Sequence, residues 1–137
     1  MTARWRRPRL LAEASYALIK ASVTVLLMPR ARLTAALGDP VRASTAVPSA
    51  AQVAIARDVG WAVERLTLRG PLPAACLAQA LAARDLLRRR HIPCTLTLGI
   101  ASQPGGSIRA HAWLRVGEHT ITGGRGRHAF WPVAGFN

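Results

Sequence analysis

The fold is decided by the stretch Pro71-Leu72-Pro73-Ala74-Ala75-Cys76-Leu77-Ala78-Gln79-Ala80-Leu81. The two prolines favour an extended segment, because each ring fixes φ and Pro lacks a backbone N–H donor. An alanine- and leucine-rich run follows and predicts a helix that continues to about Arg89. Cys76 then falls in the first helical turn, on the inward-packing face that it shares with Ala80, Ala83 and Leu87.

The position of Cys76 at a helix start has a chemical consequence. Backbone N–H groups of a first turn lack helical partners, and the helix dipole is positive there. Such a field stabilises a thiolate, which is the nucleophile of cysteine catalysis. The alternative interpretation is a small buried thiol on the core face of the helix.

The composition restricts the classes of function. At 137 residues, half of them hydrophobic, the chain is long enough for one folded domain and too apolar for a disordered one. Lys and Arg number 19 against 6 Asp and Glu, for a formal net charge of +13, and Lys20 is the single lysine. With four Trp, one Tyr, two Phe and no recognisable nucleic-acid module, we expect an acidic peptide or protein partner rather than nucleic acid.

The two cysteines, Cys76 and Cys94, argue against a disulfide framework. Cys94 lies in a predicted strand and is interpreted as a buried hydrophobic residue. The chain shows no secretory signal, so we expect a cytoplasmic protein. No CxxC or HExxH spacing is present, and we predict neither a metal site nor a cofactor.

The N-terminal part is predicted to be a basic arm (residues 1–9) followed by an apolar helix over residues 10–28, which Pro29 ends. This helix is nearly long enough to span a bilayer, but Glu13 and Lys20 lie inside it. We favour burial against the domain or a partner over attachment to a membrane surface. Residues 1–37 would thus form the arm and helix, 38–50 a linker, and 51–137 the core of a single domain.

The remaining pattern predicts one more helix and a sheet. Ser49 is a candidate N-cap for a helix to about Leu66. Its apolar residues toward a core are Val53, Ala56, Val63 and Leu66, with Trp61 nearby. After the cysteine helix, alternating β-forming residues predict strands at 94–100, 108–116 and 119–122 and a short last strand at 130–133. Residues 101–107 are a predicted loop, and Gly117-Glu118 a two-residue turn. Helices followed by an antiparallel sheet define an α+β fold.

His111 is the leading candidate for a base that acts on Cys76. It lies in the middle of a predicted strand between Ala110 and Ala112, whose small side chains leave room around the imidazole, and Trp113 shares its face. The alternative is a structural histidine bonded to backbone. The chain's three other histidines (His91, His119 and His128) lie at a helix end, beside a turn and in a polar loop, and are weaker candidates.

Three stretches carry a family resemblance. The helix beginning Cys76-Leu77-Ala78-Gln79-Ala80-Leu81 and ending at Arg90 resembles the cysteine helix of the lasso peptide biosynthesis B2 proteins, which are transglutaminase-like leader peptidases. The strand Leu96-Thr97-Leu98-Gly99-Ile100 and the later strand Ala110-His111-Ala112-Trp113-Leu114-Arg115-Val116 are similar to the second half of that pattern. The resemblance covers most of the chain, and its specific part is residues 71–124.

This resemblance implies a transglutaminase-like, papain-like cysteine peptidase core, with Cys76 as nucleophile and His111 as general base. The implied reaction removes the leader from a ribosomally synthesised lasso precursor peptide. The implied partners are that precursor peptide, a separate small leader-binding protein called B1, and a cyclase that closes the macrolactam ring.

The chain departs from the family at the third catalytic position, which is usually an Asp on the strand after the histidine. Here that region reads Ile121-Thr122-Gly123-Gly124, and the one acid after His111 is Glu118. If Gly117-Glu118 forms the turn, Val116 pairs with His119 and Trp113 with Thr122. Thr122 would then lie diagonally across from His111, where its hydroxyl or a backbone carbonyl could hold the ring. The orienting role is therefore open.

Three other functions stay open at this point. The missing acid is compatible with a transglutaminase-like binding module that has lost catalysis. The net charge of +13 is compatible with nucleic-acid binding. The same Cys–His pair would also serve an acyltransferase, in which an amine replaces water.

Overall fold

A computed structural model describes residues 2–29, 32, 47–68, 75–124 and 129–136. Within these residues the helices are α1 (Thr2–Leu27), α3 (Ala50–Leu68) and α4 (Cys76–Arg89), and the strands are β1 (Thr95–Ser102), β2 (Ile108–Val116), β3 (His119–Thr122) and β4 (Trp131–Phe136). The strands form one sheet in the order β3-β2-β1-β4, and every neighbouring pair is antiparallel. The predicted α+β fold is confirmed.

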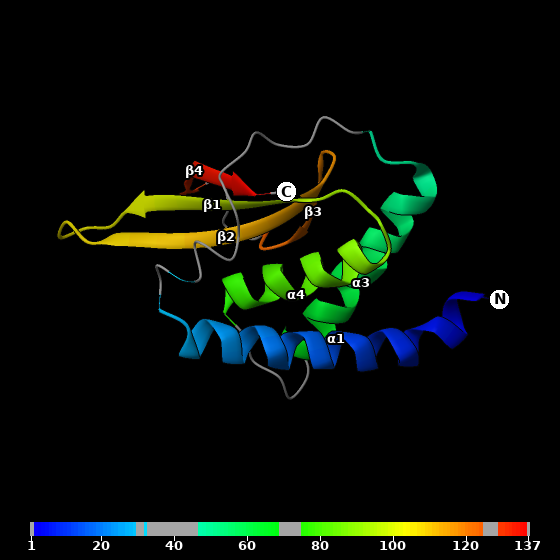
Figure 1. The fold of residues 1–137 in the computed structure, drawn as a ribbon. Coiled ribbons are helices and arrows are strands. Elements are labelled where there is room, and N and C mark those ends of the chain that lie inside the picture. Colours follow the sequence, from blue (N-terminus) through cyan, green and yellow to red (C-terminus); the bar gives the residue numbers. More distant parts are fainter. Residues whose placement is uncertain (1, 30–31, 33–46, 69–74, 125–128, 137) are drawn as a thin grey trace.

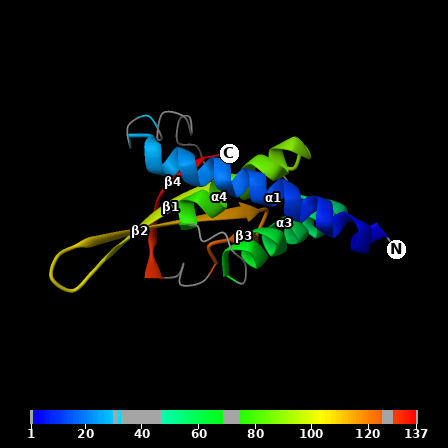
Figure 2. The ribbon, with the colours of Figure 1, turned by 90° about the horizontal axis from the view of Figure 1, so that it is seen from below.

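The helices form two layers on one side of the sheet. Figure 1 shows α4 lying against the sheet, α3 beside it, and α1 on the far side of α4. Seen from below, α1 is the nearest element and crosses the others, while the β1–β2 hairpin extends past the helices (Figure 2). The core between the layers is rich in small and aliphatic side chains, among them Ala14, Leu18, Ala80, Ala83, Leu86, Leu96, Leu114 and Phe136. The alanines allow the helix axes to approach closely.

The N-terminus differs from its prediction. Residues 1–9 are predicted to form an arm, but α1 begins at Thr2 and continues through Pro8. A proline near a helix start removes a single backbone hydrogen bond, and the apolar turns that follow can extend the helix back over it. The predicted burial of residues 10–28 holds for one face of the helix, where Leu10, Ala14 and Leu18 are buried.

The start of α3 follows its prediction. The Ser49 Oγ accepts a hydrogen bond from the Gln52 backbone N–H at 3.1 Å, and the Gln52 Oε1 accepts one from the Ser49 N–H at 2.9 Å. This reciprocal pair is a capping box. The helix ends at Leu68, two residues past its predicted end, and Trp61, expected near the core, is 37% exposed. Most of the predicted linker, residues 38–46, lies outside the described residues.

The cysteine helix also follows its prediction. It begins at Cys76 and ends at Arg89, and the predicted inner face is buried at Ala80, Ala83 and Leu87. His91 then adopts a φ of 55°, which turns the chain so that the Ile92 N–H donates to the Leu87 carbonyl at 3.0 Å.

The strands confirm the predicted order, with small changes of bounds. β2 and β3 have the predicted limits, whereas β1 begins one residue after Cys94 and extends to Ser102, and β4 begins at Trp131 and extends to Phe136. The Gly117-Glu118 turn is present, with Gly117 at a φ of 58°. Cys94 precedes β1 and is 5% exposed, so its interpretation as a buried hydrophobic residue is confirmed.

The register between β2 and β3 corrects a prediction. Val116 pairs with His119 as expected, but Thr122 pairs with Leu114 instead of Trp113. The shift arises from a β-bulge at Ile121, which lies between the pairs Arg115–Thr120 and Leu114–Thr122. Because directly paired residues share a face, Thr122 lies on the side of Leu114, and its placement on the side of His111 was wrong.

Candidate active site

A cavity of about 410 Å³ lies where α3, the start of α4 and the end of β3 meet. Cys76, His111 and Thr122, the three residues singled out from the sequence, all line it. The rest of the wall comprises Gln79 of α4, Gly60, Val63, Glu64 and Leu68 from α3 and its end, and Thr120, Ile121, Gly123 and Gly124. The fold therefore brings the predicted nucleophile and base to one cavity, although 35 positions separate 76 from 111 in the sequence.

Cys76 is the first residue of α4 and is half-buried. The preceding Ala75 has an extended backbone and no side-chain acceptor, and within the described residues no side chain caps the helix. The first intrahelical bond runs from the Gln79 N–H to the Ala75 carbonyl at 3.0 Å. The N–H groups of the first turn, that of Cys76 included, thus have no acceptor within the helix. They lie at the positive end of the helix dipole, which suits a developing anion.

His111 is held by a backbone carbonyl. Its Nε2 lies 2.7 Å from the carbonyl oxygen of Gly123. A carbonyl only accepts hydrogen bonds, so Nε2 carries the proton and Nδ1 of the neutral ring keeps its lone pair. Phe130 stacks on the imidazole at a centroid distance of 4.9 Å, and Trp113 lies at 5.9 Å. These contacts fix both the tautomer and the plane of the ring, and Nδ1 is the basic atom.

Gly123 can supply this carbonyl because it is a glycine. Its φ of 71° lies in the left-handed region, which side chains with a Cβ rarely adopt. A Cβ at this position would collide with the Ala112 carbonyl oxygen and lie 3.0 Å from the Trp113 Cα. The sequence left a backbone carbonyl open as the group that holds His111, but it did not point to Gly123, since a backbone acceptor leaves no side-chain signal. The Gly123-Gly124 pair was the only hint of an unusual backbone there.

Thr122 precedes Gly123 in the chain but does not form the hydrogen bond to His111. The residue is 6% exposed, and its Oγ1 has no hydrogen-bond partner among the described residues. The ring of His111 is instead bonded to the next residue along the chain. Glu118, the acid nearest to the expected position, is exposed at the β2–β3 turn and is not part of the cavity wall.

Glu64 is a further cavity residue that sequence reasoning missed. It lies on one face of α3 with Gly60 and Leu68, at intervals of four residues. This periodicity was available in the sequence, but the face was not linked to Cys76. α3 can approach β3 closely because Gly60 has no Cβ. A Cβ there would lie only 2.7 Å from the Ile121 carbonyl oxygen. The helix therefore forms part of the cavity wall and contributes a carboxylate to it.

Of the described histidines, His111 alone lines the cavity. His91 lies at the end of α4 and His119 at the start of β3, while His128 is outside the described residues. The second cysteine, Cys94, is not part of the cavity wall either. Burial raises the pKa of the Cys94 thiol, with the nearby Arg84 and Arg88 acting in the opposite direction.

A thiol at an uncapped helix start and an imidazole on an adjacent strand are compatible with the class of cysteine hydrolases and transferases that form a covalent acyl-enzyme. A model of the transglutaminase-like superfamily matches residues 15–135, and the chain belongs to this superfamily. The superfamily generally comprises cysteine hydrolases or transferases. Comparisons with curated proteins and with solved structures found no match.

Proposed function

We propose that the protein is a cysteine peptidase that removes the leader from a ribosomally synthesised lasso precursor peptide. The observation that carries the proposal is the shared cavity of Cys76 and His111, in which the Gly123 carbonyl fixes His111 as a base at Nδ1. The resemblance of residues 71–124 to the lasso B2 proteins supports the substrate class, and the superfamily supports the type of chemistry.

The first half of the reaction forms an acyl-enzyme. Nδ1 of His111 accepts the proton of the Cys76 thiol as the sulfur attacks the carbonyl carbon of the leader–core bond. A C–S bond forms, and the π electrons of the carbonyl move to its oxygen. The N–H groups at the start of α4, which have no acceptor within the helix, donate hydrogen bonds to this oxyanion. The C–N bond then breaks, and His111 gives its proton to the amine of the departing core peptide.

The second half hydrolyses the thioester. His111 Nδ1 accepts a proton from water, and the hydroxide attacks the thioester carbonyl. The same N–H groups stabilise the second oxyanion, after which the C–S bond breaks. The leader leaves as a carboxylic acid, and Cys76 regains a proton from His111. Gly123 holds the tautomer throughout, but as a neutral acceptor it stabilises the imidazolium less than a carboxylate would.

The partners follow from the same proposal. A small leader-binding protein of the B1 type would present the precursor, and the macrolactam cyclase would receive the core peptide. The excess of arginines gives the chain a formal charge of +13, which suits an acidic leader or partner.

Cleavage of the precursor peptide encoded beside this gene, in the presence of the neighbouring leader-binding protein, tests the proposal. Mass spectrometry should show free leader with wild type and with Cys94→Ala, the matched change at the other cysteine. Cys76→Ala and His111→Ala should lose activity by a factor on the order of 10³ or more while remaining folded.

The alternatives predict other products. If Cys76→Ala cuts as well as wild type, the nucleophile is assigned wrongly. If the leader is released as an amide when a primary amine is added, and never as the free acid, the protein is an acyltransferase. If wild type binds the precursor but cuts nothing, and Cys76 alkylates no faster than a cysteine in an unfolded peptide, the binding-module reading is correct.

A further inference from the structure

Helix α1 presents an apolar stripe to the outside. The stripe, here called the outer stripe, consists of Tyr16, Ile19, Val23, Leu26 and Leu27. The intervals between these residues are three, four, three and one, which places them on one side of the helix. All are exposed, and Leu26 and Leu27 reach 81% and 77%. Because α1 is the layer farthest from the sheet, no other described element covers this side (Figures 1 and 2). A stripe of large exposed apolar side chains indicates an interaction surface.

The helix is suited to lie on a membrane rather than to cross it. Residues Arg7–Leu27 have a mean hydropathy of 1.6 and enough length to span a bilayer. The side opposite the outer stripe, however, packs into the protein core through Leu10, Ala14, Ala17, Leu18 and Ala21. Moving α1 across a bilayer would expose that core. The helix therefore stays on the protein and offers one face only.

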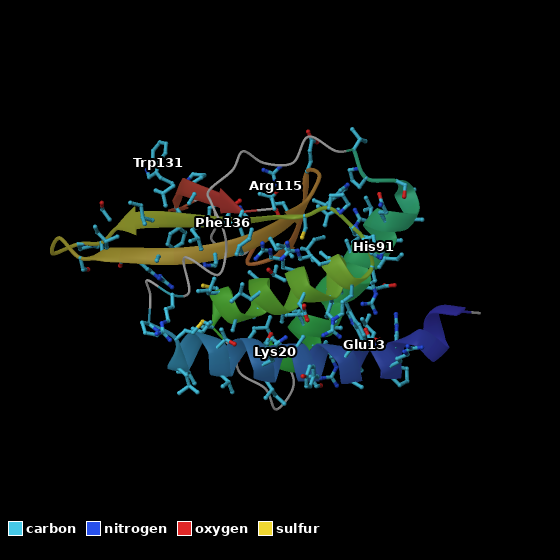
Figure 3. The ribbon with its side chains drawn as sticks, in the orientation of Figure 1. Glu13, Lys20, His91, Arg115, Trp131 and Phe136 are labelled. Atoms are coloured by element: carbon cyan, nitrogen blue, oxygen red, sulfur yellow. The ribbon has the colours of Figure 1, made fainter. Side chains whose placement is uncertain are left out.

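The charges on α1 favour an anionic surface. The sequence of the helix contains five cations, Arg4, Arg6, Arg7, Arg9 and Lys20, and one acid, Glu13. Glu13 extends from α1 toward α4 (Figure 3). Its Oε2 lies 2.6 Å from Arg90 Nη2. Lys20 is exposed within the outer stripe, four residues after Tyr16 and three before Val23. A lysine in such a place extends its ammonium to lipid phosphate while its methylene stem stays among apolar groups.

We propose that the outer stripe docks α1 in the plane of an anionic bilayer surface. Apolar side chains would enter the interface while Lys20, exposed among them, contacts a headgroup. The cavity with Cys76 is lined by residues of α3, the start of α4, β2, β3 and the glycines that follow β3, and by no residue of α1. No cavity residue takes part, so the inference does not depend on the proposed peptidase activity.

Co-sedimentation of the full chain with lipid vesicles tests the docking. Wild type should bind vesicles that contain about a third phosphatidylglycerol, bind pure phosphatidylcholine vesicles weakly, and lose affinity as salt is added. Leu26→Gln with Leu27→Gln should reduce binding about tenfold or more, since glutamine keeps the helix propensity but removes the apolar contact. Lys20→Gln should reduce binding about fivefold.

A matched control is the pair Ile108→Gln and Val133→Gln, which removes two apolar side chains that are 70% and 58% exposed on the sheet. This variant and Cys76→Ala should bind as wild type, and circular dichroism should show every variant folded. The proposal is overturned if wild type ignores anionic vesicles or if the α1 double variant binds as well as wild type. It is also overturned if wild type dimerises through the stripe, without vesicle binding, in a manner that the double variant abolishes.

Discussion

His111 Nε2 lies 2.7 Å from the carbonyl oxygen of Gly123, which takes the place that a carboxylate has in a catalytic triad. Both groups fix the same tautomer, because each accepts the Nε2 proton. They differ in charge, and only a carboxylate offsets the positive charge that His111 gains during catalysis. The chain therefore keeps the hydrogen bond that orients His111 but lacks the carboxylate charge, so we expect the proposed peptidase to be slower than an enzyme whose orienting group is a carboxylate.

Gly123→Ala should damage the site through the backbone. An alanine at a φ of 71° is strained, and its Cβ would meet the Ala112 carbonyl and Trp113. We expect a loss of about 2 kcal/mol or more in the free energy of unfolding. Displacement of the carbonyl from His111 should lower kcat/KM on the order of 10²-fold. Denaturant unfolding and the precursor cleavage assay measure the two effects.

Gly105→Ala is the matched control for this prediction. Gly105 has a φ of 92°, yet apart from its two chain neighbours no described residue has an atom within 4 Å of where its Cβ would be. The change should therefore cost the strain alone, about 1 kcal/mol, and leave kcat/KM unchanged. Equal loss of activity in both variants would mean that the His111–Gly123 bond is not what Gly123→Ala removes.

Thr122→Val should be tolerated. The Thr122 Oγ1 is buried without a partner among the described residues, and valine replaces it with a methyl group of similar size. We expect the free energy of unfolding to stay equal or to rise by about 1 kcal/mol. Since Gly123 holds His111, kcat/KM should fall less than about threefold. A fall in kcat/KM on the order of 10²-fold would show that Thr122 is the residue that orients His111.

Side-chain patterns in the sequence predicted most of the fold. The capping residues Ser49 and Gln52, the inner face of α4 and the alternation in β2 are local signals, and the corresponding elements have bounds close to those predicted. The Cys76–His111 pair followed from residue type and position within such elements. That the two residues line one cavity could be seen only in the folded structure.

What the sequence did not reveal depends on the backbone. The bulge at Ile121 moves Thr122 from Trp113 to Leu114, and no side-chain preference in β3 marks an extra residue. The carbonyl of Gly123 is chemically the same group as that of any other residue. The extension of α1 through Pro8 depends on packing by later turns and outweighs the local preference of the arginine-rich arm.

The two cysteines should differ in their reaction with iodoacetamide. Burial raises the pKa of the Cys94 thiol and also blocks access, since the residue is 5% exposed. At about pH 8 the native protein should gain one label, at Cys76, and Cys94 should react at least about tenfold more slowly. Cys76→Ala should gain no label until denaturant is added. Peptide mapping by mass spectrometry reads the sites, and native labelling at Cys94 would contradict its burial.

The ion pair between Glu13 and Arg90 should make stability depend on pH. The hydrogen bond from Arg90 is the main cause that lowers the pKa of the Glu13 carboxyl, and burial acts against it. A lowered folded pKa means that the stabilisation is full above the unfolded value of about 4.3 and is lost as pH falls through the folded value. Glu13→Gln should therefore reduce the free energy of unfolding by about 1 kcal/mol at neutral pH and by almost nothing near pH 2.

The matched control is Glu118→Gln, because Glu118 is exposed at the β2–β3 turn. Its substitution should change the free energy of unfolding by less than about 0.5 kcal/mol at neutral pH. Denaturant unfolding of the three proteins at several pH values gives the comparison. If the deficit of Glu13→Gln stays constant down to about pH 2, the carboxylate charge is not its cause. The contact would then join α1 to the end of α4 through packing and a neutral hydrogen bond alone.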